Sequence, residues 1–216
     1  VVKQRNTLLK TSRNASNVST LEIWNEKLVS LGTELIRERA KLTDALRPYL
    51  ERAYREIVDA DHSPSLRWEL SWGGDFEANL SERFTSALQE ILPVERERGV
   101  SLIGPHRDEL VLELNGLPVK GYASHGESWS FVLALKLAAI EVLRAESTIG
   151  DPVVILDDVF AELDSGRRAR LLSAIRGYEQ VLITAAVVED IPAEIDAQLQ
   201  YVRAGNLVSP GEIDDE

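Results

Sequence analysis

The sequence predicts an α/β protein in which a helical arm is followed by two parallel strands joined by a helix. Two observations support this class. Apolar residues recur at steps of three and four between Leu21 and Ile57, which is typical of a helix face. Two short apolar runs, residues 153–156 and 181–186, enclose an amphipathic segment, the pattern of a strand–helix–strand unit. We therefore predict two domains, residues 1–145 and 146–216.

The composition excludes several classes of protein. The chain contains no cysteine, which rules out disulfide bonds and thiolate metal sites. No apolar run reaches the roughly 18 residues of a membrane span, and the N-terminus lacks the charged-then-apolar pattern of a signal peptide. These features predict a cytoplasmic protein without a membrane partner.

Charge is distributed unevenly along the chain. The net charge is −12, yet residues 1–60 carry eleven Lys and Arg against eight Asp and Glu. An acidic body disfavours unspecific adhesion to nucleic acid, whereas a local basic surface can still bind phosphates. The first cations precede any acid and form the candidate DNA contact: Lys3, Arg5, Lys10 and Arg13. A solvated polar face is the alternative for each of them.

The first long helix is predicted from an apolar stripe. Its members are Leu21, Trp24, Leu28, Leu31 and Leu35, and a similar pattern continues from Leu42 to Ile57. Pro48 interrupts this pattern, so we expect a kink or a new helix there. The stripe covers too few heptads for a dimeric coiled coil, and we expect it to pack against its own domain.

The middle of the chain mixes strands with a helix. A half-buried strand and a turn are predicted where apolar residues alternate with polar ones up to Gly73-Gly74: Leu66, Trp68, Leu70 and Trp72. Residues 76–92 are predicted to be helical, ending before Pro93. An Asn115-Gly116 turn between residues 111–114 and 117–120 predicts a hairpin, whose second strand Pro118 weakens.

A candidate anion site lies at the start of a buried helix. The segment from Ala123 to Ser128 reads ASHGES, and the run after it is apolar on nearly every side and rich in helix-forming residues. Ser124 and Gly126 would leave backbone amides open to an outside ligand, and the helix dipole favours an anion there. We expect a phosphate-binding corner, with an ordinary helix cap as the alternative.

A second candidate site follows a short apolar strand. Residues 152–156 are typical of a fully buried strand in a parallel sheet, and ligands bind beyond the carboxyl ends of such strands. Asp157 and Asp158 stand at that end and should point to opposite faces, so we expect different roles for them. One would hold hydrated Mg²⁺, and the other would orient or deprotonate an attacking water. An acidic turn that ends a strand is the alternative.

The order of these elements resembles the second half of an ABC-type ATPase head. A Ser-x-Gly-Glu helix start, a strand ending in two acids, a Leu-Asp pair and an apolar strand with Thr184 follow one another. The resemblance makes the chain a head fragment, with a helical arm lobe and the C-terminal part of a P-loop α/β lobe. It implies that the signature, which reaches ATP on a second subunit, consists of Ser124, Gly126 and Glu127. It implies Asp157 as the Walker B ligand of Mg²⁺ and places Asp158 where the general base normally lies. Asp164 would be the D-loop acid at the dimer interface.

Two departures from the family pattern predict slow ATP turnover. Asp158 stands where many such heads carry a longer glutamate, which would hold water closer to phosphorus. Ala185 and Ala186 follow the strand of Thr184 in place of a switch histidine. The resemblance assigns no role to Thr184 itself.

Longer strings resemble the RecF family of DNA-repair ATPases. They are GPHRDEL from Gly104, LDDVFAELD from Leu156 and KQRNTLLK from Lys3. The resemblance implies an ATP-dependent homodimer that clamps gapped DNA near single-strand to double-strand junctions. Its implied partners are RecO and RecR, and its implied outcome is the loading of RecA in recombinational repair, with links to DNA replication and the SOS response. His106 and Arg107 lie in the first string, where pairing with nearby acids and contact with nucleotide or DNA are both open.

One element of the family pattern is missing from the sequence. No Gly-Lys pair occurs in the 216 residues, so there is no G-x-x-x-x-G-K-[ST] loop to cradle phosphates, and the chain also contains no methionine. We interpret the chain as the C-terminal part of a longer RecF-like protein without the Walker A half. Alone, it is expected neither to bind ATP and Mg²⁺ tightly nor to hydrolyse ATP.

Three other interpretations stay open. A metal-dependent nuclease or phosphotransferase could use Asp157, Asp158 and Asp164 as an acid cluster. A non-catalytic module could bind a partner through the helical arm. Another SMC-type ATPase head is a nearer alternative, disfavoured because the arm is too short for a long coiled coil.

Overall fold

The computed structural model describes residues 1–11, 18–74 and 79–209. The chain divides into two units, Val1–Pro152 and Val153–Glu216. The first unit contains the long helices and a three-stranded sheet, and the second contains a two-stranded parallel sheet with a helix between its strands. This mixture confirms the predicted α/β class. The predicted boundary at residue 145 lies in the last turn of the helix that ends at Glu146.

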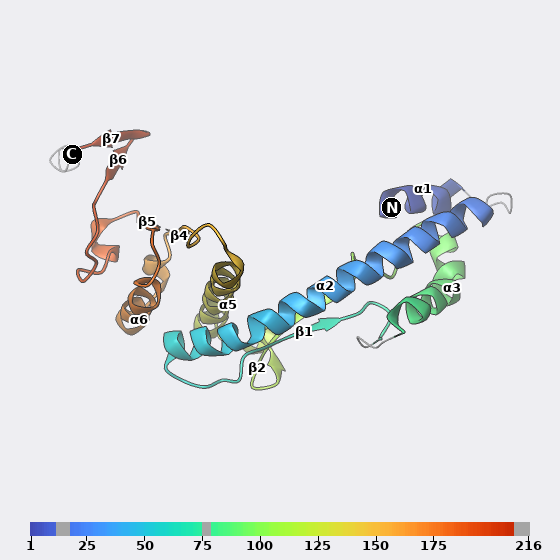
Figure 1. Ribbon diagram of the computed structural model, residues 1–216, viewed down its shortest axis with the longest axis horizontal. Helices are drawn as coiled ribbons and strands as arrows, with labels where there is room; N and C mark the ends of the chain where they lie inside the picture. Colours follow the sequence, from blue (N-terminus) through green and yellow to red (C-terminus); the bar gives the residue numbers. More distant parts are fainter. Residues whose placement is uncertain (12–17, 75–78, 210–216) are drawn as a thin grey trace. The chain divides into compact units, whose positions relative to one another are not determined.

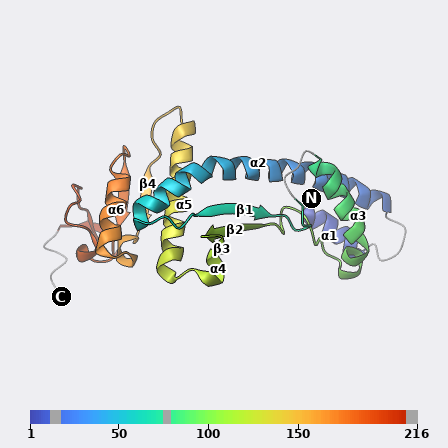
Figure 2. The same ribbon diagram turned by 90° about the horizontal axis from the view of Figure 1, so that it is seen from below.

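One helix organises the first unit. Helix α2 (Val18–Val58) contacts α1 (Val2–Thr11), α3 (Leu80–Arg98) and α5 (His125–Glu146). Figures 1 and 2 show α1 and α3 beside the N-terminal half of α2 and α5 beside its C-terminal end. No helix within the described ranges is long and apolar enough to cross a membrane.

The buried face of α2 follows the helical period closely. Its hydrophobic members are Leu21, Leu28, Val29, Ile36, Leu46, Leu50, Ala53, Tyr54 and Ile57. The predicted stripe is wrong in its middle, because Leu31, Leu35 and Leu42 are 54%, 45% and 52% exposed. Residues spaced by sevens drift around a helix of 3.6 residues per turn, so this part of the stripe moves out of the interface.

Two helices continue through an internal proline. Helix α2 includes Pro48 and is curved (Figure 2), and α3 includes Pro93 and extends to Arg98. The predicted helix end before Pro93 is therefore wrong. A proline removes one helical hydrogen bond, but buried residues on both sides of Pro93, such as Leu88 and Glu95, keep the helix packed across it. The helix ends instead at Gly99, whose φ of +67° suits glycine.

The predicted hairpin is confirmed. Strand β1 (Ser65–Glu69) pairs antiparallel with β2 (Glu109–Leu114), which pairs with β3 (Leu117–Pro118). Asn115 and Gly116 have φ values of +52° and +76°, as a two-residue turn with two positive-φ positions requires. Strand β3 ends at Pro118, and the short helix α4 (Val119–Tyr122) then leads to α5.

The second unit contains the predicted parallel pair. Strand β4 (Val154–Asp157) lies in register with β5 (Val181–Thr184), and α6 (Ser165–Ile175) connects them. Single turns of 3₁₀ helix occupy Phe160–Glu162 and Val188–Asp190, and β6 (Tyr201–Arg203) forms a hairpin with β7 (Asn206–Val208). The prediction of a fully buried strand is wrong: Val154 is buried, but Ile155 is 65% exposed. Among the described residues, only one face of this sheet is covered.

Candidate functional site

The predicted anion corner is the start of α5, which is capped by its own side chains. Ser124 is the N-cap of α5, and its hydroxyl accepts a hydrogen bond from the Glu127 amide at 3.2 Å. The Glu127 carboxylate accepts one from the Ser124 amide at 2.8 Å. This capping box directs both side chains to the helix backbone, while the amides of the first-turn residues His125 and Gly126 head the helix. The ordinary cap is therefore present, and the corner still offers amides and the positive end of a helix dipole to an anion.

The predicted acid pair is organised by Thr184. In the register of β4 and β5, Asp157 lies opposite Thr184, whose hydroxyl donates to Asp157 Oδ1 at 2.5 Å. The Asp158 amide donates to the Thr184 carbonyl at 3.2 Å and approaches its hydroxyl oxygen at 3.1 Å. The two strands thus end in one polar cluster, and Thr184 fixes the direction of the Asp157 carboxylate. Both acids are exposed.

Asp158 leaves the strand by a sharp turn. Its φ is +53°, in the left-handed region, which a short polar side chain such as aspartate tolerates better than most. Because β4 ends at Asp157, the predicted strand alternation does not set the direction of Asp158. Asp157 ends the strand and Asp158 begins the loop, so their carboxylates are held by different backbone geometry.

Asp164 is the N-cap of α6. Its Oδ1 accepts a hydrogen bond from the Arg167 amide at 2.9 Å, and its Oδ2 lies 3.4 Å from Arg167 Nη1. The hydrogen bond donated by the Arg167 backbone amide, followed by the positive charges of Arg167 and Arg170, lowers the pKa of Asp164 below its usual value. Asp164 is therefore anionic at neutral pH and stabilises the start of the helix that follows the acid pair.

A divalent cation would find one suitable protein ligand at the end of β4. Thr184 occupies one oxygen of Asp157, which leaves the other oxygen for a hard cation, and Mg²⁺ in phosphate sites takes few carboxylates. Across the described ranges, no group of three or more His, Asp or Glu could hold a metal ion. Asp157, Asp158 and Asp164 thus do not form the acid cluster that a nuclease would need.

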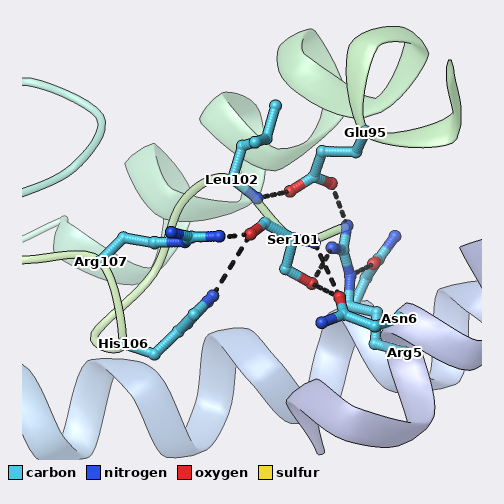
Figure 3. A network of polar contacts seen from close by, with 8 residues as sticks. Arg5, Asn6, Glu95, Ser101, Leu102, His106 and Arg107 are labelled. Atoms are coloured by element: carbon cyan, nitrogen blue, oxygen red, sulfur yellow. Dashed lines mark hydrogen bonds and ion pairs between the residues drawn. The ribbon is translucent and has the colours of Figure 1, made fainter. Parts of the chain in front are cut away.

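The N-terminal arginine predicted to touch DNA is buried. Arg5 is 0% exposed, and its three guanidinium nitrogens donate to Asn25 Oδ1, Ser101 Oγ and Glu95 Oε2 at 2.7, 2.7 and 2.5 Å. Glu95 is also 0% exposed, and Figure 3 shows its carboxylate facing the Arg5 guanidinium. This burial contradicts a DNA contact for Arg5, because a charge held by an interior carboxylate cannot reach a phosphate outside.

The remaining predicted DNA contacts are two exposed lysines and one residue outside the described ranges. Lys3 and Lys10 are exposed on α1 and form no ion pair within the part of the chain that is described. Lys10 packs against Gly99, at the C-terminal end of α3. Arg13 lies outside the described residues.

His106 and Arg107 share one acceptor. His106 Nε2 lies 3.5 Å and Arg107 Nε 3.3 Å from the Ser101 carbonyl oxygen (Figure 3). Among the described residues, neither side chain forms an ion pair with an acid, which was one of the two open alternatives. The nearby Asp108 accepts from the Ser71 amide at 2.8 Å and lies 3.8 Å from Arg39. Burial, followed by the charges of Arg107 and Arg5, lowers the pKa of His106, so its ring is neutral at pH 7.

Five residues of this network were not anticipated from the sequence: Asn6, Asn25, Glu95, Ser101 and Leu102. Asn6 Oδ1 accepts from both the amide and the hydroxyl of Ser101, each at 2.7 Å. One signal was available for Arg5 itself, because it lies four residues after Val1 and four before Leu9, on their helix face. Nothing local marks Glu95 or Ser101 as its partners, since they lie 90 and 96 residues away.

The chain is similar to a set of bacterial proteins of one name. No family model matches it. It is 51% identical to the DNA replication and repair protein RecF of Clavibacter michiganensis subsp. michiganensis over 96% of this chain, and 45% identical to that of Streptomyces avermitilis over 96%. The RecF of Leifsonia xyli subsp. xyli is 50% identical over 97%. The chain spans 57% to 60% of the length of these relatives.

Solved structures agree with these relatives. The recombination mediator protein RecF-ATPrS in the RecFOR pathway matches with a TM-score of 0.76 and 27% identity, over 88% of this chain and 52% of that chain. RecF-ATP of the same pathway matches with a TM-score of 0.73 and 27% identity, over 87% and 51%. These matches confirm the predicted ATPase-head fold and the predicted resemblance.

Proposed function

Because this chain is a RecF homologue along 96% of its length, we propose that it supplies the helical arm and the second half of the ATPase head of a DNA replication and repair protein. The chain spans 57% of that relative, so the activity proposed below belongs to the whole protein that contains this segment. That protein would bind ATP, dimerise on DNA and hydrolyse ATP to release it.

The observation that carries this proposal is the Thr184–Asp157 hydrogen bond at the end of two parallel strands. It holds a carboxylate in one orientation at the sheet edge where ligands of α/β proteins bind. Asp157 would hold Mg²⁺, which would neutralise phosphate charge when bound. Asp158, on the neighbouring loop, would orient the attacking water. Its side chain is one carbon shorter than glutamate, which supports slow turnover.

A second copy of the chain would complete each site. The Ser124–Gly126 corner offers helix-start amides, and a triphosphate bound near Asp157 of the other copy would supply the anion. Asp164, anionic at a helix start, would lie at the interface between the copies. Glu127 caps the same helix start as Ser124 and would fix the position of these amides.

The proposed partners follow from the relatives. The solved RecF structures belong to a pathway named RecFOR, which supports RecO and RecR as partners. A homodimer as the active form and gapped DNA with single-strand to double-strand junctions as the substrate complete the proposal. Loading of RecA and a role in the SOS response would be the outcome, and the cytoplasm would be the location. Lys3 and Lys10 remain the proposed DNA contacts of α1, without Arg5.

The chain alone is proposed to be inactive. Its sequence has no Gly-Lys pair and therefore no phosphate-cradling loop, and without that loop Asp157 has no nucleotide to serve. Measurable ATP hydrolysis by the purified chain would contradict this part of the proposal.

A segment exchange tests the proposed activity. This chain would replace the matching 57% of the Clavibacter RecF, and DNA-stimulated ATP hydrolysis would be measured for the chimera. Asp157→Asn should lower turnover by about 100-fold, because the metal ligand is lost. Asp196→Asn removes an exposed acid of the same unit and should have no effect. Equal turnover in the two variants would refute the assignment of Asp157.

A further inference from the structure

The segment from Ser101 to Asp108 is held rigidly in the first unit. The Gly104 amide donates to Ser71 Oγ at 2.8 Å, and Arg39 Nη1 donates to the Pro105 carbonyl at 2.8 Å. Gly104 has a φ of +124°, which only glycine adopts readily. A Cβ on Gly32 of α2 would lie 3.3 Å from Pro105, so helix and loop are in close contact.

The start of this segment is locked by α1. Ser101 receives a hydrogen bond from Arg5 on its hydroxyl, and its amide and hydroxyl both donate to Asn6. Its carbonyl oxygen is thereby fixed in place, and it is this oxygen that His106 and Arg107 approach (Figure 3). The two exposed side chains are therefore aimed by a buried network.

Arg107 has unused binding capacity. Its Nε points to the Ser101 carbonyl, while its two terminal nitrogens form no hydrogen bond or ion pair within the described ranges. A guanidinium fixed through Nε presents those nitrogens as a rigid fork, which is the geometry that phosphate and carboxylate groups accept. His106 lies beside it, with its ring partly buried against the Ser101 carbonyl.

The acids around this segment are already engaged. Glu95 accepts from Arg5 and from the Leu102 amide, and Asp108 has a fully buried side chain that faces Ser71 and Arg39. Glu95 and Asp108 therefore do not neutralise Arg107, although the chain as a whole has a net charge of −12. An anionic ligand would meet an available cation here.

We propose that Arg107 binds a backbone phosphate of nucleic acid on this segment through its two terminal nitrogens. The exposed lysines Lys3 and Lys10 lie on α1, the helix whose Arg5 and Asn6 bind Ser101, so α1 and this segment both carry exposed cations. A polyanion with repeated phosphates matches such a distribution better than a single nucleotide. The inference rests on the DNA-binding part of the proposed function and assigns it residues outside α1.

The test is the salt dependence of DNA binding by the whole chain. A fluorescent 20-base-pair duplex would be titrated at several salt concentrations. MgATP would be titrated in a parallel series against the chimera in which this chain replaces the matching part of the Clavibacter RecF. Arg107→Ala should weaken duplex binding about tenfold and reduce the slope of log K against log salt by about 0.9, the loss of one phosphate contact. Arg107→Lys keeps the charge without the fork, so it should keep most of the slope and lose about threefold in affinity.

The matched control is Arg176→Ala, which removes one exposed arginine from the second unit and should change neither affinity nor slope. Circular dichroism would verify that each variant is folded. Equal effects of Arg107→Ala and Arg176→Ala would overturn the inference and leave the proposed function standing. Loss of MgATP binding instead of duplex binding would reassign Arg107 to a nucleotide and overturn the nucleic-acid assignment. Failure of the unaltered chain to bind duplex would overturn both this inference and the DNA contacts proposed for α1.

Discussion

His106 is the residue through which pH should act on the stability of the first unit. Its pKa in the folded chain is lowered from 6.5, first by burial and then by the charges of Arg107 and Arg5, and only Asp108 and the Ser101 carbonyl oppose this. The unfolded chain therefore binds a proton more readily. Stability should fall as pH drops below 6.5 and should level off below the lowered pKa of the folded state.

His106→Gln should flatten this dependence. Urea unfolding followed between pH 7.5 and pH 5 should show a smaller loss of stability for His106→Gln than for the unaltered chain. His125→Gln, at the exposed start of α5, is the control and should preserve the slope. Parallel curves for the unaltered chain and His106→Gln would show that the His106 environment is not the one described.

Single residues differ in how far their roles could be predicted. Ser124 was predicted at a helix start and is found there, because capping depends on neighbours within three residues. Arg5 was predicted at the surface from its charge, and its burial depends on Glu95, which is distant in sequence. Thr184 acquired a role only from the strand register, which no local pattern specifies.

The ion pair between Arg5 of α1 and Glu95 of α3 is the most testable contact between elements. The Arg5–Glu95 pair is fully buried, and Glu95 also accepts from the Leu102 amide at 2.7 Å. Glu95→Ala should lower the free energy of unfolding by about 3–5 kcal/mol, because the Arg5 guanidinium would stay buried without a counter-charge. Chemical denaturation monitored by tryptophan fluorescence would measure this loss.

Glu90→Ala is the control for the Arg5–Glu95 ion pair. Glu90 lies on the exposed face of the same helix, so its replacement should change stability by less than about 0.5 kcal/mol. If both variants lost the same small amount, α1 would not be held by the ion pair.

Helices and strands were predicted well in kind and less well in extent. The hairpin at Asn115-Gly116 follows from local turn chemistry and is confirmed. The end of α3 was placed at Pro93, where local rules favour a break, but packing on both sides carries the helix to Arg98. The exposed middle of the α2 stripe arises from accumulated drift, which becomes visible only over 41 residues.

For the whole molecule, the family was predicted from the order of the motifs along the chain and not from any single motif. The Ser-x-Gly-Glu helix start and the strand ending in Asp157 occur in the predicted order, and relatives at 51% identity agree with the predicted family. The two motifs lie in different units of the chain. Their joint action in a dimer therefore remains a proposal that an experiment on two copies must test.

The most direct measurement is ATP turnover by a mixture of two inactive chimeras, one carrying Asp157→Asn and the other Ser124→Arg. Each alone should be inactive, because every composite site would lack one half. In mixed dimers, one site joins an intact Asp157 to an intact Ser124, so turnover should recover to about a quarter of the unaltered level in an equimolar mixture of freely exchanging subunits. No recovery above the separate variants would contradict the claim that two copies share each site.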